Sequence, residues 1–117
     1  MPEDPLLANK LQNLSLSADS KTAEDALSRG LAYYWGTGVV KNDEEAVKWY
    51  RLSADQGDID AQINLGYMYE HGRGVALNCA EAVKWYREAA DQGDADGQWN
   101  LGLMYKSGKG VALIHPL

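Results

Sequence analysis

The sequence contains no phenylalanine, a single cysteine and only three prolines among its 117 residues. The lone Cys79 excludes an internal disulfide and a metal cluster built from cysteines. No stretch approaches the roughly 18 apolar residues that a membrane-spanning helix requires. Residues 1–14 lack both the basic region and the continuous apolar region of a secretion signal. We therefore expect a cytoplasmic protein without a membrane span.

Positive charge is also scarce, because 11 lysines and arginines stand against 17 acidic side chains, for a net charge of −6. A field of this sign repels nucleic acid and anionic membrane surfaces. Basic side chains such as Lys48 and Lys84 lie close in sequence to glutamates such as Glu44 and Glu81. This mixture is typical of solvated helix faces rather than of a phosphate-binding stripe. We expect neither a nucleic-acid nor a membrane partner.

A repeat of 36 residues dominates what is present. The heptapeptide EAVKWYR at residues 45–51 recurs at residues 81–87. Aligned at this offset, residues 45–75 and 81–111 agree at 22 of 31 positions, and a fainter copy begins near Glu24. A fixed period of this length is typical of a solenoid built from one supersecondary unit.

Each repeat predicts two helices. Residues 43–55 and 60–71 both have the apolar spacing of amphipathic helices. Glycines at residues 72 and 74 follow the helix at 60–71 and interrupt the chain before the second helix of that unit, because glycine tolerates the positive φ of a tight reversal. The side chains that we expect to cap helix N-termini are Asn42, Asp58, Asn78 and Asp94.

Small and aromatic side chains indicate how the repeats pack. Alanine or glycine is expected where helix axes approach closely, at Ala46, Gly66, Ala82 and Gly102. Aromatic side chains are expected to fill the space between adjacent units, namely Trp49, Tyr50, Trp85 and Tyr86.

These residues together resemble the Sel-one-like repeat (SLR) family, a relative of the tetratricopeptide repeats. The resemblance is carried by Leu65-Gly66, Tyr69, Gly72, Gly74-Val75, Ala82, Trp85-Tyr86 and Ala90-Asp91-Gln92-Gly93, and by the corresponding residues of the neighbouring copies. It implies an all-α, right-handed α-solenoid of antiparallel helix pairs, and an adaptor or scaffold role in protein complexes. Arg29 and Asp25 stand where the family has leucine and alanine, so the first repeat is degenerate.

The chain divides into five segments on this basis. They are an N-terminal amphipathic segment and linker (1–22), a degenerate first repeat (23–58), a second repeat (59–94), half of a third (95–111) and a tail (112–117). Within the first segment, residues 5–14 have helical leucine spacing. The tail leaves the last unit without its second helix.

Residues that differ between near-identical repeats are the candidates for function. Six of the nine mismatches fall on the first helix of the unit, which by similarity to tetratricopeptide repeats lines the concave groove. The expected partner-binding residues are Leu31, Tyr34, Trp35, Ile63, Tyr67, Glu70, His71, Trp99, Leu103 and Lys106. We expect the groove to accept a short extended or helical segment of a protein, with Trp99 and Tyr67 as anchors. The alternative is that these side chains pack against one another or against the N-terminal segment.

Other functions compete with this hypothesis. The incomplete last unit favours a fragment of a longer array, docking of the tail, or a homo-oligomer formed through the open C-terminal end. An enzyme like the cysteine-rich, secreted members of the family would need cysteine pairs, which this sequence lacks.

Catalytic, metal and cofactor sites are not expected. His71 and His115 have no carboxylate or cysteine partner at ligand spacing. The recurring Gly-x-Gly segments follow helices rather than strands, so they predict turns and not phosphate loops. The Asp58-x-Asp60 and Asp94-x-Asp96 pairs lack the glycine and distal glutamate of a calcium loop and predict helix caps.

Overall fold

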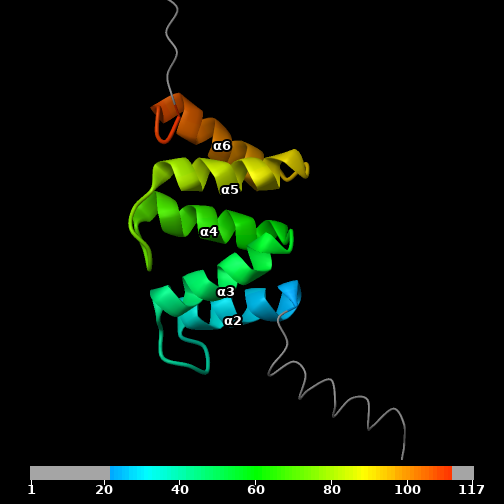
Figure 1. Cartoon of the computed structure of the whole chain (residues 1–117), viewed down its shortest axis with the longest axis vertical. Coiled ribbons are helices and arrows are strands. Elements are labelled where there is room, and N and C mark those ends of the chain that lie inside the picture. The colour runs from blue at the N-terminus through cyan, green and yellow to red at the C-terminus, as the bar shows by residue number, and fades with distance from the viewer. Residues whose placement is uncertain (1–21, 112–117) are drawn as a thin grey trace, which may run out of the picture.

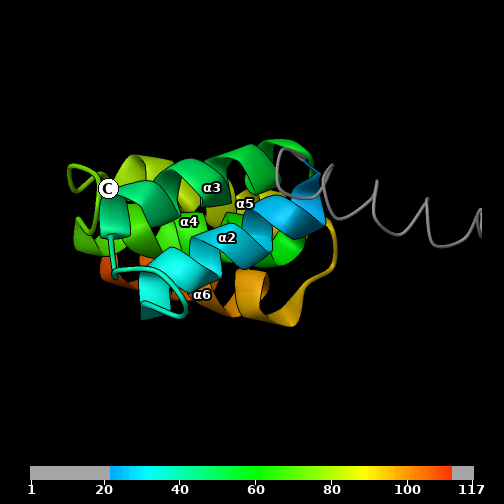
Figure 2. The same ribbon diagram turned by 90° about the horizontal axis from the view of Figure 1, so that it is seen from below.

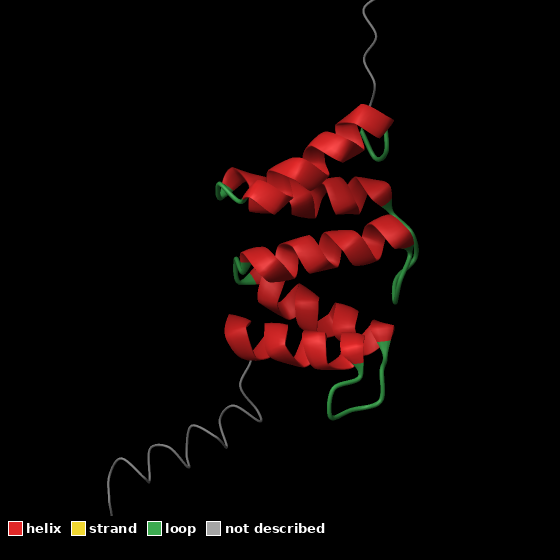
Figure 3. Ribbon diagram, turned by 180° about the vertical axis from the view of Figure 1, so that it is seen from behind, coloured by secondary structure: helices red, strands yellow, loops and turns green. Residues whose placement is uncertain are grey.

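The computed structural model describes residues 22–111 as five helices of 13 residues each and no strand (Figures 1 and 3). The helices are α2 (Ala23–Trp35), α3 (Asp43–Asp55), α4 (Ile59–His71), α5 (Cys79–Asp91) and α6 (Ala95–Ser107). The expected N-terminal amphipathic segment and the tail lie outside the described residues.

Consecutive helices run antiparallel and pack on one another along a single stack, from α2 at one end to α6 at the other (Figure 1). Seen along the stack, α3 and α5 lie along one side and α2 and α6 along the other (Figure 2). The arrangement confirms the expected all-α fold of antiparallel helix pairs. It places the first helix of each unit, α2, α4 and α6, where residues from all three can share a surface.

The expected caps are present at the helix N-termini. Asn42 and Asn78 accept hydrogen bonds from the backbone N–H groups three residues ahead, at 3.1 Å in each case. Asp58 and Asp94 accept the corresponding bonds at 2.8 and 2.9 Å. These carboxylates satisfy backbone donors that a helix leaves unpaired, which explains the recurring Asp-x-Asp pairs without a bound cation.

Two glycine–tyrosine contacts hold the helices of the first two units together. Tyr50 and Tyr86 are each about 1% exposed, and each ring packs against a glycine of the preceding first helix. A Cβ atom added to Gly30 would lie 2.5 Å from the Tyr50 ring, and one added to Gly66 would lie 2.6 Å from the Tyr86 ring. Glycine is therefore needed at both positions because a ring occupies the space of its missing side chain.

Gly102, the equivalent glycine of the third unit, has no such contact within residues 22–111. No heavy atom lies within 4 Å of the position that a Cβ of Gly102 would take. The expected close approach of a helix at Gly102 is therefore wrong for the described residues. No second helix follows α6 among residues 22–111, so no ring equivalent to Tyr86 packs there within the described part of the chain.

The two tryptophans of the second helices also differ. Trp85 is 9% exposed and packs in one core cluster with residues of α3 and α4, as expected of a side chain between units. Trp49 is only partly buried, and the Arg29 guanidinium lies 4.9 Å from its ring centroid. The expectation that Trp49 fills a space between units is wrong here, because no unit precedes α2 among residues 22–111. Arg29, a departure from the family pattern, instead covers that ring.

No helix among the described residues is both long and apolar enough to cross a bilayer.

Candidate functional site

A cleft of about 530 Å³ opens on the face formed by the first helices. Its residues come from α2, α4 and α6, with side chains of α3 and α5 reaching it from behind. The volume lies within the range of roughly 300–1,000 Å³ that is common for binding sites. The cleft spans several helices, so it is suited to a ligand that crosses the stack.

Eight of the ten residues predicted from the sequence line this cleft. They are Leu31, Tyr34, Trp35, Ile63, Tyr67, Glu70, His71 and Leu103. Several of the large apolar members are well exposed, with Trp35 at 70% and Tyr67 at 38%. Exposed apolar side chains gathered in a concave surface are a common feature of interaction sites.

Trp99 and Lys106 lie outside the cleft, so the prediction of Trp99 as an anchor is not supported by its position. Trp99 is 69% exposed on α6, one turn before Leu103, which does line the cleft. The lining residues of α2 lie only in its C-terminal half, from Leu31 onward. Asn100, the next residue of α6, does line the cleft, so Trp99 lies just outside its lining.

Sequence reasoning missed two asparagines that line the cleft at equivalent positions, Asn64 and Asn100. Both are partly exposed, and neither side-chain amide has a hydrogen-bond partner within residues 22–111. A free amide offers two donors and an acceptor, which match the N–H and C=O groups of a polypeptide backbone. The comparison of mismatches overlooked these residues because they are identical in both repeats, although their place on the first helix was a usable signal.

Tyr50, Met68 and Tyr86 also line the cleft, although the sequence assigned the two tyrosines to the core. Both assignments are correct, because a ring packed against a glycine can still present one edge to the cleft. Burial raises the pKa of both phenols above the ordinary value, and in Tyr86 the hydrogen bond to Glu70 adds to the effect. The Tyr86 hydroxyl donates this bond to Glu70 Oε1 at 2.8 Å, which holds Glu70 at the cleft wall.

A polar cluster contacts the cleft through Tyr34. The Arg73 guanidinium donates a hydrogen bond to the Tyr34 hydroxyl at 2.8 Å and forms an ion pair with Asp43 at 3.2 Å. Lys41 forms a second ion pair with Asp43 at 2.8 Å. The hydrogen bond from Lys41 and the nearby Arg73 charge hold the pKa of Asp43 below its ordinary value of 3.8. Arg73 thus joins the turn after α4 to the start of α3 and fixes Tyr34 of α2.

The ion pairs of Asp43 predict that the stability of the fold depends on pH. A carboxyl whose pKa is lowered by folding stabilises the protein above its ordinary pKa, and the contribution is lost as the pH falls through the folded value. We expect Asp43→Asn to lower the urea midpoint at pH 7 and to converge on the wild-type midpoint well below pH 3.8. Glu44→Gln is the matched control, because Glu44 is an exposed carboxyl in the same helical turn with no ion pair within residues 22–111. If both variants lowered the urea midpoint equally at pH 7, the ion pairs of Asp43 would not be the source of the stabilisation.

Residues able to bind a metal ion do not gather in the described part of the chain, where no group of three His, Cys, Asp or Glu side chains has suitable positions. His71 ends α4 and its ring packs at a tilt against Tyr67, with ring centroids 4.3 Å apart. Cys79 is a free thiol at the start of α5 and does not line the cleft. The geometry of the cleft suits recognition through shape, ring contacts and amide hydrogen bonds.

Comparison with protein families matches the chain to the Sel1 repeat model at residues 23–58, 59–94 and 95–112. No curated protein matches the chain.

Solved structures give the same result. The chain is similar to a Sel1 repeat protein from Oxalobacter formigenes, at 40% identity and a TM-score of 0.78, over 86% of this chain and 42% of the other. It is equally similar, at 40% identity and a TM-score of 0.78, to a protective antigen of uropathogenic Escherichia coli strains that displays an SLR fold, over 86% of this chain and 22% of the antigen. Cysteine-rich protein B of Helicobacter pylori matches at 29% identity and a TM-score of 0.65, over 68% of this chain and 59% of that protein. The first two relatives are thus more than twice as long as the chain described here.

Proposed function

This chain belongs to the Sel1 repeat family, and on that premise we propose that it acts as a non-catalytic protein-interaction module. Repeat proteins of this kind present extended concave surfaces to their partners. The observation that carries the proposal is the cleft of about 530 Å³, whose lining comes from three successive repeats. The partner is a short segment of another protein that crosses the first helices.

The lining of the cleft favours an extended segment with apolar side chains. Tyr67 and Leu103 offer exposed apolar surface from adjacent repeats, as does Leu31 from the first. The amides of Asn64 and Asn100 stand among these side chains without partners in residues 22–111. An extended segment presents backbone amides and alternating side chains, so it can use both kinds of contact at once.

A panel of peptides tests this proposal. Random peptides displayed on phage would be selected on the immobilised chain, and enriched sequences would be measured against purified variants by fluorescence anisotropy. We expect Tyr67→Ala and Asn64→Ala each to weaken binding about tenfold or more, which corresponds to about 1.4 kcal/mol. Both side chains are at least partly exposed, so both variants should remain folded.

Trp99→Ala is the matched control for this experiment. It removes a large, 69% exposed aromatic side chain from a first helix but lies outside the cleft. Selected peptides should bind this variant with unchanged affinity. Peptides that lose affinity for Trp99→Ala but not for Tyr67→Ala would move the site out of the cleft and reject the proposal.

A further inference from the structure

A second pocket lies at the far end of the stack, away from the cleft. It has a volume of about 320 Å³ and is formed by α5, α6 and the turn after α6. Its lining residues are Ala80, Val83, Lys84, Arg87, Tyr105, Gly110 and Val111. None of these residues lines the cleft, so this pocket is a separate site.

The same pocket occurs one repeat earlier, where a side chain fills it. The residues equivalent to Val83, Tyr105 and Val111, 36 positions earlier, are Val47, Tyr69 and Val75. All three of these earlier residues pack in the core cluster that contains Trp85. Trp85 of α5 therefore occupies the site between α3 and α4 that corresponds to the pocket between α5 and α6.

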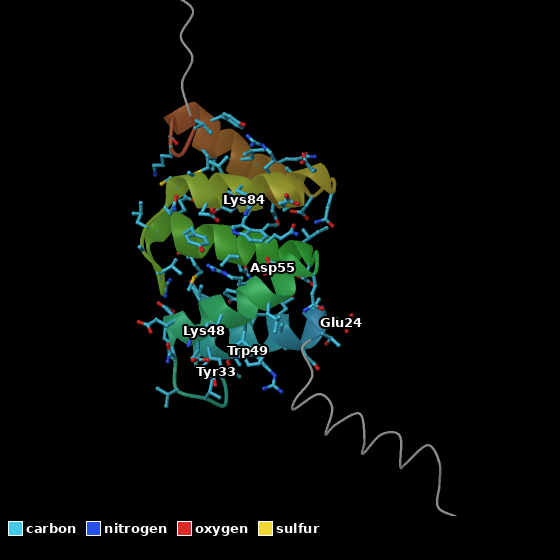
Figure 4. The ribbon with its side chains drawn as sticks, in the orientation of Figure 1. Glu24, Tyr33, Lys48, Trp49, Asp55 and Lys84 are labelled. Carbon is cyan, nitrogen blue, oxygen red and sulfur yellow. The ribbon has the colours of Figure 1, made fainter. Side chains whose placement is uncertain are left out.

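The walls of the two sites match in their polar contacts as well. Arg51 donates a hydrogen bond to the Tyr69 hydroxyl, and Arg87 donates one to the Tyr105 hydroxyl. Lys48 and Lys84 hold equivalent positions on α3 and α5 (Figure 4). The two sites differ in solvent exposure. Tyr105 is 44% exposed, whereas Tyr69 is partly buried beside Trp85. The pocket thus has walls equivalent to those around Trp85.

Gly102 adds an independent observation next to this pocket. Gly30 and Gly66 each face a tyrosine ring that follows a tryptophan in the chain, whereas no heavy atom of residues 22–111 lies within 4 Å of the Cβ position at Gly102. The end of the stack therefore offers one place for a tryptophan and a neighbouring place for a tyrosine. In α5 these two side chains are consecutive, Trp85-Tyr86, and both are buried.

We propose that the α5–α6 end of the stack binds, in trans, an amphipathic α-helix that carries an adjacent Trp-Tyr pair. The tryptophan enters the pocket beside Val83 and Tyr105, and the tyrosine ring packs on Gly102. A small residue three positions before the tryptophan, like Ala82 before Trp85, lets the helix approach closely. This site goes beyond the cleft and takes a different class of ligand, a helix rather than an extended segment.

The chain supplies its own probe for this site. A synthetic peptide of residues 78–92, with blocked ends and a fluorescent label, reproduces the capped helix α5 and its Trp-Tyr pair. We expect saturable binding to the full 117-residue chain by fluorescence anisotropy. Peptides with alanine in place of the tryptophan or of the tyrosine should bind at least tenfold more weakly, and a scrambled peptide should not bind.

Gly102→Ala is the decisive variant of the protein. The added methyl group has no neighbour within 4 Å among residues 22–111, and alanine favours a helix over glycine, so the variant should be at least as stable as the wild type. It should nevertheless weaken peptide binding at least tenfold, because the same methyl group at Gly66 would lie 2.6 Å from the tyrosine ring. Tyr67→Ala, a cleft variant, should bind the peptide normally, which separates this site from the proposed function.

Other outcomes overturn the proposal. Absence of binding to the full chain, or binding that Gly102→Ala leaves unchanged, would reject the site. Binding that appears only after Leu113 and Ile114 are replaced with aspartate would make the tail the occupant instead. Concentration-dependent dimers in light scattering that Gly102→Ala abolishes would make a second copy of the chain the occupant.

Discussion

Replacing Tyr86 with alanine is expected to lower the free energy of unfolding by about 3–5 kcal/mol. The ring is about 1% exposed and packs on Gly66, which has no side chain to move into the space that the ring would leave. The resulting void would separate α4 from α5, the two helices of the central unit. Since a domain is stabilised by only about 5–15 kcal/mol in total, this single change should bring the protein close to unfolding.

Urea denaturation followed by circular dichroism measures the loss, and Tyr86→Phe is its control. Phenylalanine keeps the ring against Gly66 and removes only the hydrogen bond to Glu70, which is worth about 0.5–1.5 kcal/mol. The alanine variant should therefore lose several times more stability than the phenylalanine variant. Equal losses would mean that the hydroxyl, rather than the packed ring, joins the two helices.

Gly74→Ala is expected to have the second large effect. Gly74 has a φ of +70°, a conformation that costs an L-residue about 1–2 kcal/mol. Its Cβ would also lie 2.3 Å from the backbone oxygen of Asp43, which cannot move aside as a side chain could. Overpacking of this kind costs about 1–3 kcal/mol further. The turn after α4 would have to move away from the start of α3, which would also break the ion pair between Arg73 and Asp43.

Gly38→Ala separates the two causes. Gly38 holds the same place in the first repeat, with a φ of +76°, but no atom lies within 4 Å of its Cβ position. The Gly38 variant should be destabilised only by the unfavourable backbone conformation. Its urea midpoint should therefore lie between those of the wild type and of Gly74→Ala. A Gly38 variant as unstable as the Gly74 variant would show that backbone conformation alone accounts for the effect.

The fold could be predicted from the sequence because local and repeat signals agree. The caps at Asn42, Asp58, Asn78 and Asp94 each combine the right residue type with the right spacing, and each cap is present. The glycine–tyrosine contacts were only partly foreseen, because the repeat gives Gly66 and Gly102 the same role. Their environments differ because Tyr86 packs on Gly66, whereas no ring packs on Gly102 within residues 22–111.

Most of the cleft lining followed from the idea that differences between near-identical repeats mark a binding surface. This idea found Ile63, Tyr67 and Leu103, but it also selected Trp99, which lies outside the cleft. A difference between two repeats does not show which side chains line a concavity, because the lining depends on how the helices pack against one another. The identical Asn64 and Asn100 were missed for the same reason.

The cleft draws its walls from α2, α4 and α6, yet the packing of the fold joins mainly helices that are consecutive in the chain. Units held together in this way can open from the ends without disturbing the middle. A segment seated across the cleft would act as a brace along the stack, tying helices that the fold itself links only through intermediaries. Occupancy should therefore appear as slower hydrogen exchange in the end helices as well as at the contact residues.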